Sequence, residues 1–487
     1  MKEHDSSPDS TDSAPPWRAD VLAAILTLCC ALPGVILMWD FTVDDSLIAP
    51  RYAHHLVQGV GYRFSAADGV TDGVTPLGWA HVLVPFARGG VLSAWMAAKW
   101  IGAASWLAGV ALLGVAIRRV SDSNRKWLAL VLLALCTPTA AWSVAGMETG
   151  VVLGMAAAAM AMRVLRPSWS VPCAALVAAW RPEALPWALV IAATPGRDEH
   201  LDGWQRARRM GLTLLPSAAL GLLRWLVFGQ FQPLSLLAKQ PDFTLGYRYA
   251  VACFLLTGPI ALLAFRGLPT WVRALQFSVL VHLAAMAMAG GDWMPLSRLM
   301  VIALPGCMLA AAHIFASGGP VWAGLRLTIS AAGLLFVAWR VGPRAAKVGT
   351  TRLALVDAAR DKLRGRCAVG TVDAGWVGAA TESRIVDFAG VTDPAVAAMS
   401  GGHTSKQVPR GLLDARGVDT VVLLLAKDAR VATPWFESRF RRYTEAYLAP
   451  RLGAMGFAAH SLRSGALHYL VATRTVACPL QAKEQMR

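Results

Sequence analysis

Residues 21–39 read VLAAILTLCCALPGVILMW, an apolar run that is long enough to cross a bilayer as a helix. The polar stretch that follows is Phe41-Thr-Val-Asp-Asp-Ser-Leu-Ile-Ala-Pro-Arg-Tyr-Ala-His-His55, with two adjacent carboxylates, Asp44 and Asp45. Ionised groups at a membrane boundary either face water or take part in chemistry there. The positions of the other polar clusters in the chain help to decide between these alternatives.

The composition of the whole chain is typical of a membrane protein. Of its 487 residues, 56% are hydrophobic and 16% are charged, whereas a soluble domain has about 25% charged residues. Repeated apolar runs of about 20 residues predict a multi-span helical membrane protein. The net charge of +16 fits short cytoplasmic loops rich in Lys and Arg, and we expect no nucleic-acid partner.

The apolar runs predict about eleven transmembrane helices within residues 21–340. Residues 1–20 are rich in Ser, Asp and Pro and are expected to form a disordered cytoplasmic N-terminus. Residues 40–91 are expected to form the first outward loop, whose glycines require tight turns. Two half-length helices, 168–179 and 184–194, are expected on either side of Arg181-Pro-Glu183, because charge at membrane depth is tolerated only inside protein or along a wet cavity.

Residues 341–487 are no longer membrane-like and predict a small α/β domain. Because an odd number of spans precedes it, we expect this domain to be extracytoplasmic. The expected strands are 366–372, 418–425 and 467–473, and the expected helices are 351–363 and 438–448. An extracytoplasmic location would allow Cys367 and Cys478 to form a disulfide. The other six cysteines lie in apolar runs, where we expect them to be small core residues.

Basic loops alternate with loops that carry polar motifs. The basic loops are 118–126, 163–167, 195–210 and 266–273. The motif loops carry Asp44-Asp45, Glu148, Arg181-Pro-Glu183, Lys239 and Asp292. Since basic short loops mark the cytoplasmic face, all five motif loops are predicted to share the outer face of the membrane.

The Asp44-Asp45 pair is the leading candidate for chemistry. One carboxylate could act as a general base for a hydroxyl, while its neighbour orients a partner or a metal. If a helix follows, Asp44, Arg51 and His55 lie on one of its faces, and Tyr52 belongs to the same stretch. The alternative is a solvated helix N-terminus, where Asp is favoured anyway. His54 and His55 could bind a divalent metal together with the pair, although their spacing is not diagnostic.

The other motif loops supply charged and aromatic candidates for substrate binding. These are Glu148, Arg181, Glu183, Lys239, Asp292, Trp293 and Arg298. The functional interpretation is a cavity in which Arg and Lys bind a phosphate. The alternative is snorkelling or internal ion pairing, such as Glu148 with Arg181. Trp293 and Trp376 could stack on sugars, although Trp at a membrane interface more often serves as an anchor.

Eight short motifs occur in an order that resembles a known enzyme family. They are Asp44-Asp45 with Arg51-Tyr52, Gly59-Val-Gly61, Gly146-Met-Glu-Thr149, Arg181-Pro-Glu183, Ala238-Lys239, Gly290-Gly-Asp-Trp-Met-Pro295, Asp373-Ala-Gly375 and Asp387-Phe-Ala-Gly-Val-Thr-Asp-Pro394. The chain resembles the GT-C superfamily of glycosyltransferases, and more closely the bacterial group that includes the mycobacterial terminal β-(1→2)-arabinofuranosyltransferase. It departs from that group at His55 and at Asp72-Gly-Val-Thr75, which leaves the sugar and the acceptor open.

The resemblance implies an inverting glycosyltransferase in the bacterial cytoplasmic (inner) membrane. Its donor would be a polyprenyl-phosphate sugar and its acceptor a cell-envelope glycan or glycolipid. Arg181 and Lys239, helped by Arg298, would hold the donor phosphate, and Asp44 or Asp45 would deprotonate the acceptor hydroxyl. The alternatives are a transporter or flippase, or a non-catalytic assembly factor for lipid-linked surface polysaccharide. We find no internal repeat of the kind that transporters usually have.

Overall fold

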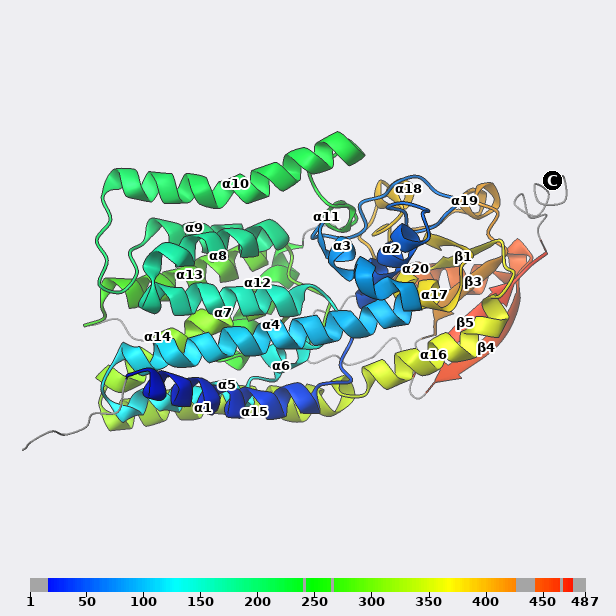
Figure 1. The fold of residues 1–487 in the computed structure, drawn as a ribbon. Coiled ribbons are helices and arrows are strands. Elements are labelled where there is room, and N and C mark those ends of the chain that lie inside the picture. Colours follow the sequence, from blue (N-terminus) through cyan, green and yellow to red (C-terminus); the bar gives the residue numbers. More distant parts are fainter. Residues whose placement is uncertain (1–15, 240–241, 264–266, 426–442, 465–466, 476–487) are drawn as a thin grey trace, which may run out of the picture.

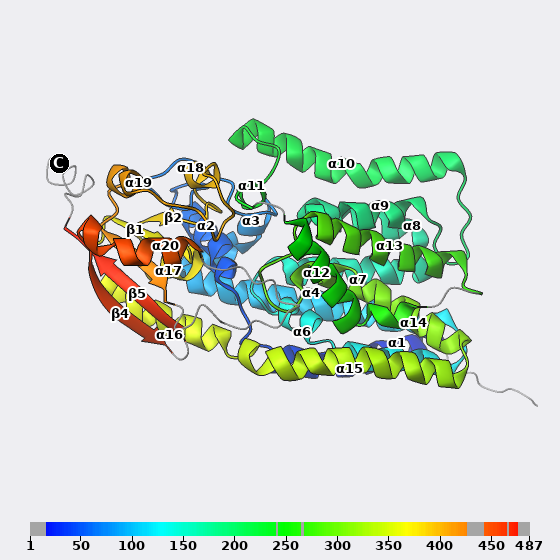
Figure 2. The same ribbon diagram turned by 180° about the vertical axis from the view of Figure 1, so that it is seen from behind.

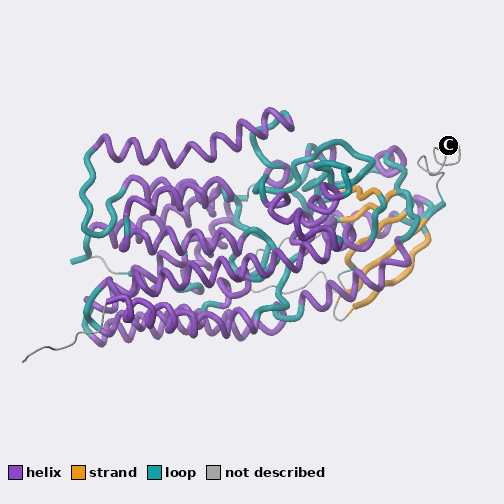
Figure 3. The backbone as a smooth tube through the Cα atoms, viewed as in Figure 1, coloured by secondary structure: helices purple, strands orange, loops and turns teal. Residues whose placement is uncertain are grey.

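The computed structural model describes residues 16–475 except 240–241, 264–266, 426–442 and 465–466. Helices lie side by side at one end of the molecule, and the strands gather at the other end (Figures 1 and 3). The long helices of the first part are α1 (Pro16–Leu37), α4 (Val91–Val120), α7 (Thr149–Leu165), α10 (Gly203–Phe228), α12 (Phe243–Leu256), α13 (Thr270–Met288), α14 (Leu304–Ser317) and α15 (Pro320–Ala345).

Within the described residues, five helices are long and apolar enough to cross a membrane. They are Trp17–Leu37, Val91–Val120, Gly203–Phe228, Thr270–Met288 and Pro320–Leu363. A sixth span results if η3 (Asn124–Leu128) with α5 (Ala129–Leu135) and α6 (Thr137–Ser143) are taken together, despite a bend of 57° between them. The remaining apolar helices have only 10–17 residues, so the predicted count of about eleven is not confirmed.

The two half-length helices around Arg181-Pro-Glu183 are confirmed. They are α8 (Pro167–Trp180) and α9 (Leu185–Ala193), joined by the short 3₁₀ helix η4 (Pro182–Ala184). Pro182 stands at the first position of η4, where a missing backbone N–H costs nothing. The break therefore puts Arg181 and Glu183 at the end of a helix pair, next to the second part of the molecule.

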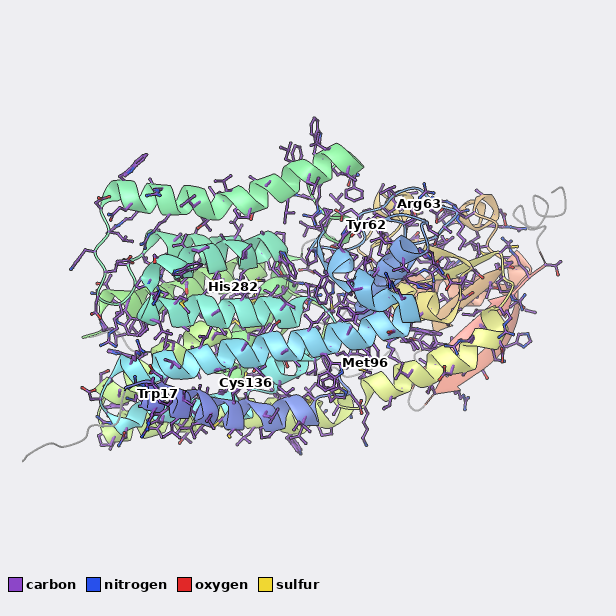
Figure 4. The ribbon with its side chains drawn as sticks, in the orientation of Figure 1. Trp17, Tyr62, Arg63, Met96, Cys136 and His282 are labelled. Carbon is purple, nitrogen blue, oxygen red and sulfur yellow. The ribbon has the colours of Figure 1, made fainter. Side chains whose placement is uncertain are left out.

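Residues 40–91 contain more regular structure than the predicted loop. They form η1 (Asp44–Leu47), α2 (Ile48–Val57), α3 (Trp79–Leu83) and η2 (Val84–Gly89). Buried apolar residues of this segment pack in one cluster with residues of the sheet end, including Trp376 and Val369. The segment is therefore held between the helices and the sheet, and Figure 4 labels Tyr62 and Arg63 within it.

The C-terminal part contains a five-stranded sheet with the strand order β2-β1-β3-β5-β4. The strands are β1 (Ala368–Thr371), β2 (Arg384–Asp387), β3 (Thr420–Leu424), β4 (Ala458–Ser464) and β5 (Leu467–Thr473). β1 is parallel to both β2 and β3, whereas β5 is antiparallel to β3 and β4. Three of these strands, β1, β3 and β5, were predicted, and β2 and β4 were not.

The helices of this part are α16 (Val348–Leu363), α17 (Ala374–Ala380), α18 (Pro394–Ala397), α19 (Arg410–Ala415) and α20 (Tyr443–Leu448). α16 agrees with the predicted helix over 351–363, and α20 with the described end of the helix predicted over 438–448. α15 leads almost directly into α16, and Figure 2 shows the two following one another along the molecule. The six cysteines in apolar runs are free thiols, while Cys478 lies outside the described residues and its pairing with Cys367 stays a prediction.

Candidate functional site

A cavity of 1310 Å³ lies where the helical part meets the sheet part. One wall comes from η1, the loop before α7, η4 and the segments on either side of α11 (Leu234–Leu237) and of η6 (Arg298–Ile302). The other wall comes from the ends of β1 and β2, the loop at residues 403–404, and α20. Pockets for a single small ligand are about 300–1,000 Å³, so this cavity has room for two substrates side by side.

The five predicted motif loops meet in this cavity. Besides Asp44, the predicted site residues that line it are Asp45, Glu148, Arg181, Glu183, Lys239, Trp293 and Arg298. Asp292 is buried directly behind Arg298, whose Nε donates to its Oδ2 at 2.6 Å. Loops that are far apart in the sequence thus meet at one cavity, while the membrane face that their parity predicts for them stays a prediction.

Asp44 also reaches the cavity, but both of its carboxylate oxygens are already bound. The backbone N–H groups of Gly375 and Trp376, at the start of α17, each donate to it at 2.9 Å. Arg352 of α16 lies 3.4 Å from the same carboxylate. A Cβ on Gly375 would stand 1.9 Å from the backbone oxygen of Asp44, so only glycine allows this approach. Asp44 therefore fastens the sheet part to η1.

Asp45 has the opposite environment. Among the described residues its carboxylate has no hydrogen-bond or ion-pair partner, and it is only partly buried. Burial raises its pKa to about 6, an effect that the positive charges of Arg298 and Lys239 partly offset. For Asp44, burial and the charge of Asp373 raise the pKa against the lowering effect of Arg352. Of the two carboxylates, Asp45 is the one able to accept a proton from a ligand.

The three cavity cations differ in how they are neutralised. Arg181 contacts Glu148 at 2.8 Å and Glu183 at 2.5 Å, and Arg298 is paired with Asp292. The internal ion pair considered for Glu148 and Arg181 is therefore present. Lys239 forms no ion pair with any residue that the structure describes. Its ammonium group is thus the cation most available to an anionic ligand, and burial lowers its pKa.

Arg51, Tyr52 and His55 do not line the cavity. The Arg51 guanidinium donates to the backbone oxygens of Phe64, Gly378, Thr381 and Ser383. The Tyr52 hydroxyl lies 2.6 Å from the hydroxyl of Thr71, and His55 Nδ1 lies 2.8 Å from the backbone oxygen of Arg63. These three side chains join residues 40–91 internally and to the sheet part, so they act on the site through the fold.

The expected face that combines Asp44, Arg51 and His55 is not present, because η1 ends at Leu47 before α2 begins. His54 bonds to the backbone oxygen of Ala87 and to the side chain of Gln58, away from the aspartate pair. Among the described residues, no three His, Cys, Asp or Glu side chains stand together as a metal site. The divalent metal considered for this stretch stays a prediction without a ligand set.

The sheet wall adds acidic and aromatic side chains that were not among the candidates. Asp387 is the last residue of β2, Asp373 follows β1, and Glu445 lies on α20. Burial raises the pKa of Asp387 to about 6, against the backbone N–H bonds that it accepts from Thr392 and Ala389. The carboxyl ends of neighbouring parallel strands meet at one edge, so the predicted strand over 366–372 could have pointed to Asp373, whereas Asp387 follows a strand that was not predicted.

Two aromatic rings meet across the cavity. Trp293, from the helical part, has its ring centroid 5.8 Å from that of His403, from the sheet part, and both line the cavity. Trp376, the other tryptophan considered for sugar stacking, is completely buried against Tyr469 and does not line the cavity. Of the two tryptophans considered for sugar stacking, Trp293 is therefore the one that lines the cavity, and Trp79 lines it as well.

Searches among protein-family models, curated proteins and solved structures each found no match to this chain. The cavity and its residues are therefore the basis on which a function is proposed.

Proposed function

We propose that the protein is a glycosyltransferase that moves a sugar from a polyprenyl-phosphate donor to a hydroxyl of a cell-envelope glycan or glycolipid. The proposal is carried by one observation. Within the part of the chain that the structure describes, the Asp45 carboxylate has no hydrogen-bond or ion-pair partner, and the cavity that it lines also holds a cation without an ion-pair partner there, Lys239. Together they offer a base for a hydroxyl and a charge for a phosphate.

In the proposed reaction, Asp45 accepts the proton of the acceptor hydroxyl. The acceptor oxygen forms a bond to the anomeric carbon of the donor, and the bond from that carbon to the phosphate oxygen breaks on the opposite side. The electron pair leaves with the polyprenyl phosphate, so the configuration of the sugar is inverted. Positive charge aimed at the leaving phosphate lowers the barrier because negative charge develops there.

The helical wall suits the donor. Lys239 and Arg298 act electrostatically on Asp45, so a phosphate bound to them would lie close to the base. Apolar residues of the helical part also line the cavity, including Pro186 of α9, Leu236 of α11 and Ala285 of α13. A polyprenyl phosphate has the same two parts, an anionic group next to a hydrocarbon chain.

The sheet wall suits the acceptor. Its carboxylates Asp387 and Glu445 would repel a phosphate, but carboxylates are good acceptors for neutral hydroxyl groups. The rings of Trp293 and His403 offer apolar faces for the C–H side of a sugar. Asp45, on the η1 side of the cavity, interacts electrostatically with Lys239 of the helical wall and with Asp387 of the sheet wall, as expected for a base that serves both donor and acceptor.

We further propose that the cavity opens at the outer face of the cytoplasmic membrane, with the N-terminus inside and the sheet part outside. Basic residues support this orientation because they gather at the helix ends remote from the sheet. Arg118 and Arg119 both pair with Asp20 there, and Arg197 donates to the backbone oxygen of Arg119. Clustered Lys and Arg at short loops mark the cytoplasmic side.

The proposal can be tested with full-length protein purified in detergent. Farnesyl-phosphoryl arabinofuranose, mannose and glucose would serve as donor probes, with a panel of octyl glycosides as acceptors. We expect one donor to be consumed in the presence of an acceptor, with a glycosylated octyl product of inverted configuration. Absence of any product with every probe, from protein that remains folded, would favour a transporter or an assembly factor.

The rate of transfer is expected to depend on pH through Asp45. A general base works only when it is deprotonated, and its pKa is raised to about 6. We therefore expect kcat/KM to fall as the pH drops through about 6 and to be level above it. The measurement is kcat/KM for the donor between pH 5 and pH 8, within about two pH units of that value. A rate that rises as the pH falls would contradict Asp45 as the base.

Lys239→Met is expected to weaken donor binding and to shift the pH below which kcat/KM falls, which we call the acid limb of the pH profile. Loss of a charge-assisted contact to phosphate costs about 1.5–3 kcal/mol, which corresponds to an increase in KM of roughly ten- to a hundredfold. The positive charge of Lys239 also lowers the pKa of Asp45, so its removal should move the acid limb to higher pH. Lys362→Met, at an exposed lysine of α16, is the matched control and should change neither quantity.

A further inference from the structure

Lys99 is a buried cation of α4 that the proposed chemistry does not use. Its side chain is 1% exposed, and its ammonium group lies 5.0 Å from the ring centroid of Trp95 and 5.4 Å from that of Trp39. Figure 4 labels Met96, three residues earlier on the same helix, close to the junction of the two parts. A buried charge is costly unless it is well bound, so its partners are informative.

The partners of Lys99 are two backbone carbonyls from separate motif loops. Its Nζ donates to the oxygen of Phe41 at 2.9 Å and to the oxygen of Val144 at 2.7 Å. Phe41 stands three residues before Asp44, and Val144 stands four residues before Glu148. One ammonium group therefore joins the segment that carries the proposed base to the segment that carries the ion-pair partner of Arg181.

Neighbouring contacts reinforce the same junction. Thr42 Oγ1 donates to the backbone oxygen of Ala145 at 2.9 Å, and Trp95 Nε1 donates to Ser46 Oγ at 3.0 Å. Gly146 has φ of +80°, and a Cβ there would stand 2.7 Å from Trp95 Nε1. The side chains on both flanks of Asp45 are thereby tied to α4 and to the loop before Glu148.

We infer that Lys99 is a positioning residue, which sets the separation between the Asp45 carboxylate and the Glu148–Arg181 ion pair. This inference rests on the proposed function and extends it. Lys99 is not among the residues that line the cavity, so it acts on the reaction through the two backbone segments. A misplacement of about 1 Å between reacting groups can lower the rate a hundredfold. Donor binding by Lys239 depends on another loop, so KM for the donor should not change with it.

The test compares Lys99→Met with Lys126→Met in full-length protein, using the farnesyl-phosphoryl sugar and octyl glycoside that the wild type accepts. Lys126 is a matched control because its Nζ also donates to two backbone oxygens, of Arg118 and Ser121, but at the other end of α4. We expect Lys99→Met to lower kcat about a hundredfold with KM for the donor nearly unchanged. Lys126→Met should lower Tm and leave kcat unchanged.

Thr42→Val provides a second variant because it removes the hydrogen bonds of Thr42 Oγ1 to Ala145 and Ser46 without changing the shape of the side chain. It should lower kcat by a smaller factor, again without changing KM for the donor, and it carries the test alone if Lys99→Met does not fold. The inference is overturned if folded Lys99→Met, or in its absence Thr42→Val, keeps the wild-type kcat. A wild type without transfer activity overturns the proposed function itself, and is distinguished by the lack of product in every sample.

Discussion

Asp45→Asn is expected to lower the rate of sugar transfer by about 10²–10⁴-fold while leaving the protein folded. Asparagine has nearly the same shape as aspartate but cannot accept the proton of a hydroxyl. No described residue forms a hydrogen bond or ion pair with the Asp45 carboxylate, so the substitution breaks none of the hydrogen bonds or ion pairs between described residues. The measurement is kcat with the donor and acceptor probes, together with Tm of the purified variant.

The pH dependence of the residual activity of Asp45→Asn provides a second test of its role as the base. Its pH profile should lose the acid limb near pH 6 that the wild type shows, because the group that titrates there has gone. Asp387→Asn is a useful comparison, since Asp387 also lines the cavity and has its pKa raised to about 6. If Asp45→Asn kept full activity and Asp387→Asn lost it, the base would be Asp387.

Asp44→Ala is expected to lower the free energy of unfolding by about 3 kcal/mol, whatever its effect on the rate. It removes the carboxylate that accepts the N–H groups of Gly375 and Trp376 and that lies beside Arg352. These donors would remain buried without their partner, which costs more than the bond itself contributes. The measurement is Tm in detergent, and Asp45→Asn, with an unchanged Tm, is the control.

Gly375→Ala should lower the free energy of unfolding by a similar amount, because Gly375 is the residue of α17 that contacts Asp44. A Cβ at this position would meet the backbone oxygen of Asp44 at 1.9 Å, so η1 and α17 would have to move apart. A wild-type Tm for both Asp44→Ala and Gly375→Ala would contradict the role of Asp44 as the link between the two parts.

The sequence is enough to predict those elements whose residues have a strong local signal. β3 and β5 are continuous runs of β-branched and apolar residues, and the helices around Arg181-Pro-Glu183 are apolar with a proline at the break. β4 was missed because its residues, Ala458–Ser464, are mostly polar or small and largely exposed. β2 has only four residues and is defined by its pairing with β1, which no local pattern reveals.

The membership of the site was more predictable than the roles within it. The alternation of basic and motif loops predicted one membrane face for Glu148, Arg181 and Lys239, and the structure shows that all three line the same cavity. The sequence could not predict which of Asp44 and Asp45 has the structural role and which is the proposed base. Two adjacent aspartates have the same chemistry, and only their surroundings in the fold distinguish them. What separates them is the start of α17, which lies about 330 residues further along the chain and binds only Asp44.

The contact between Asp44 and α17 has a consequence for biosynthesis. Asp44, near the N-terminal end of the chain, obtains two hydrogen-bond donors from residues 375 and 376, which leave the ribosome hundreds of residues later. Until then the segment that carries Asp44 lacks both these donors and the apolar surface of the sheet part that it packs against. The cavity is therefore completed late in synthesis, and chains truncated before α17 should insert their helices yet remain inactive.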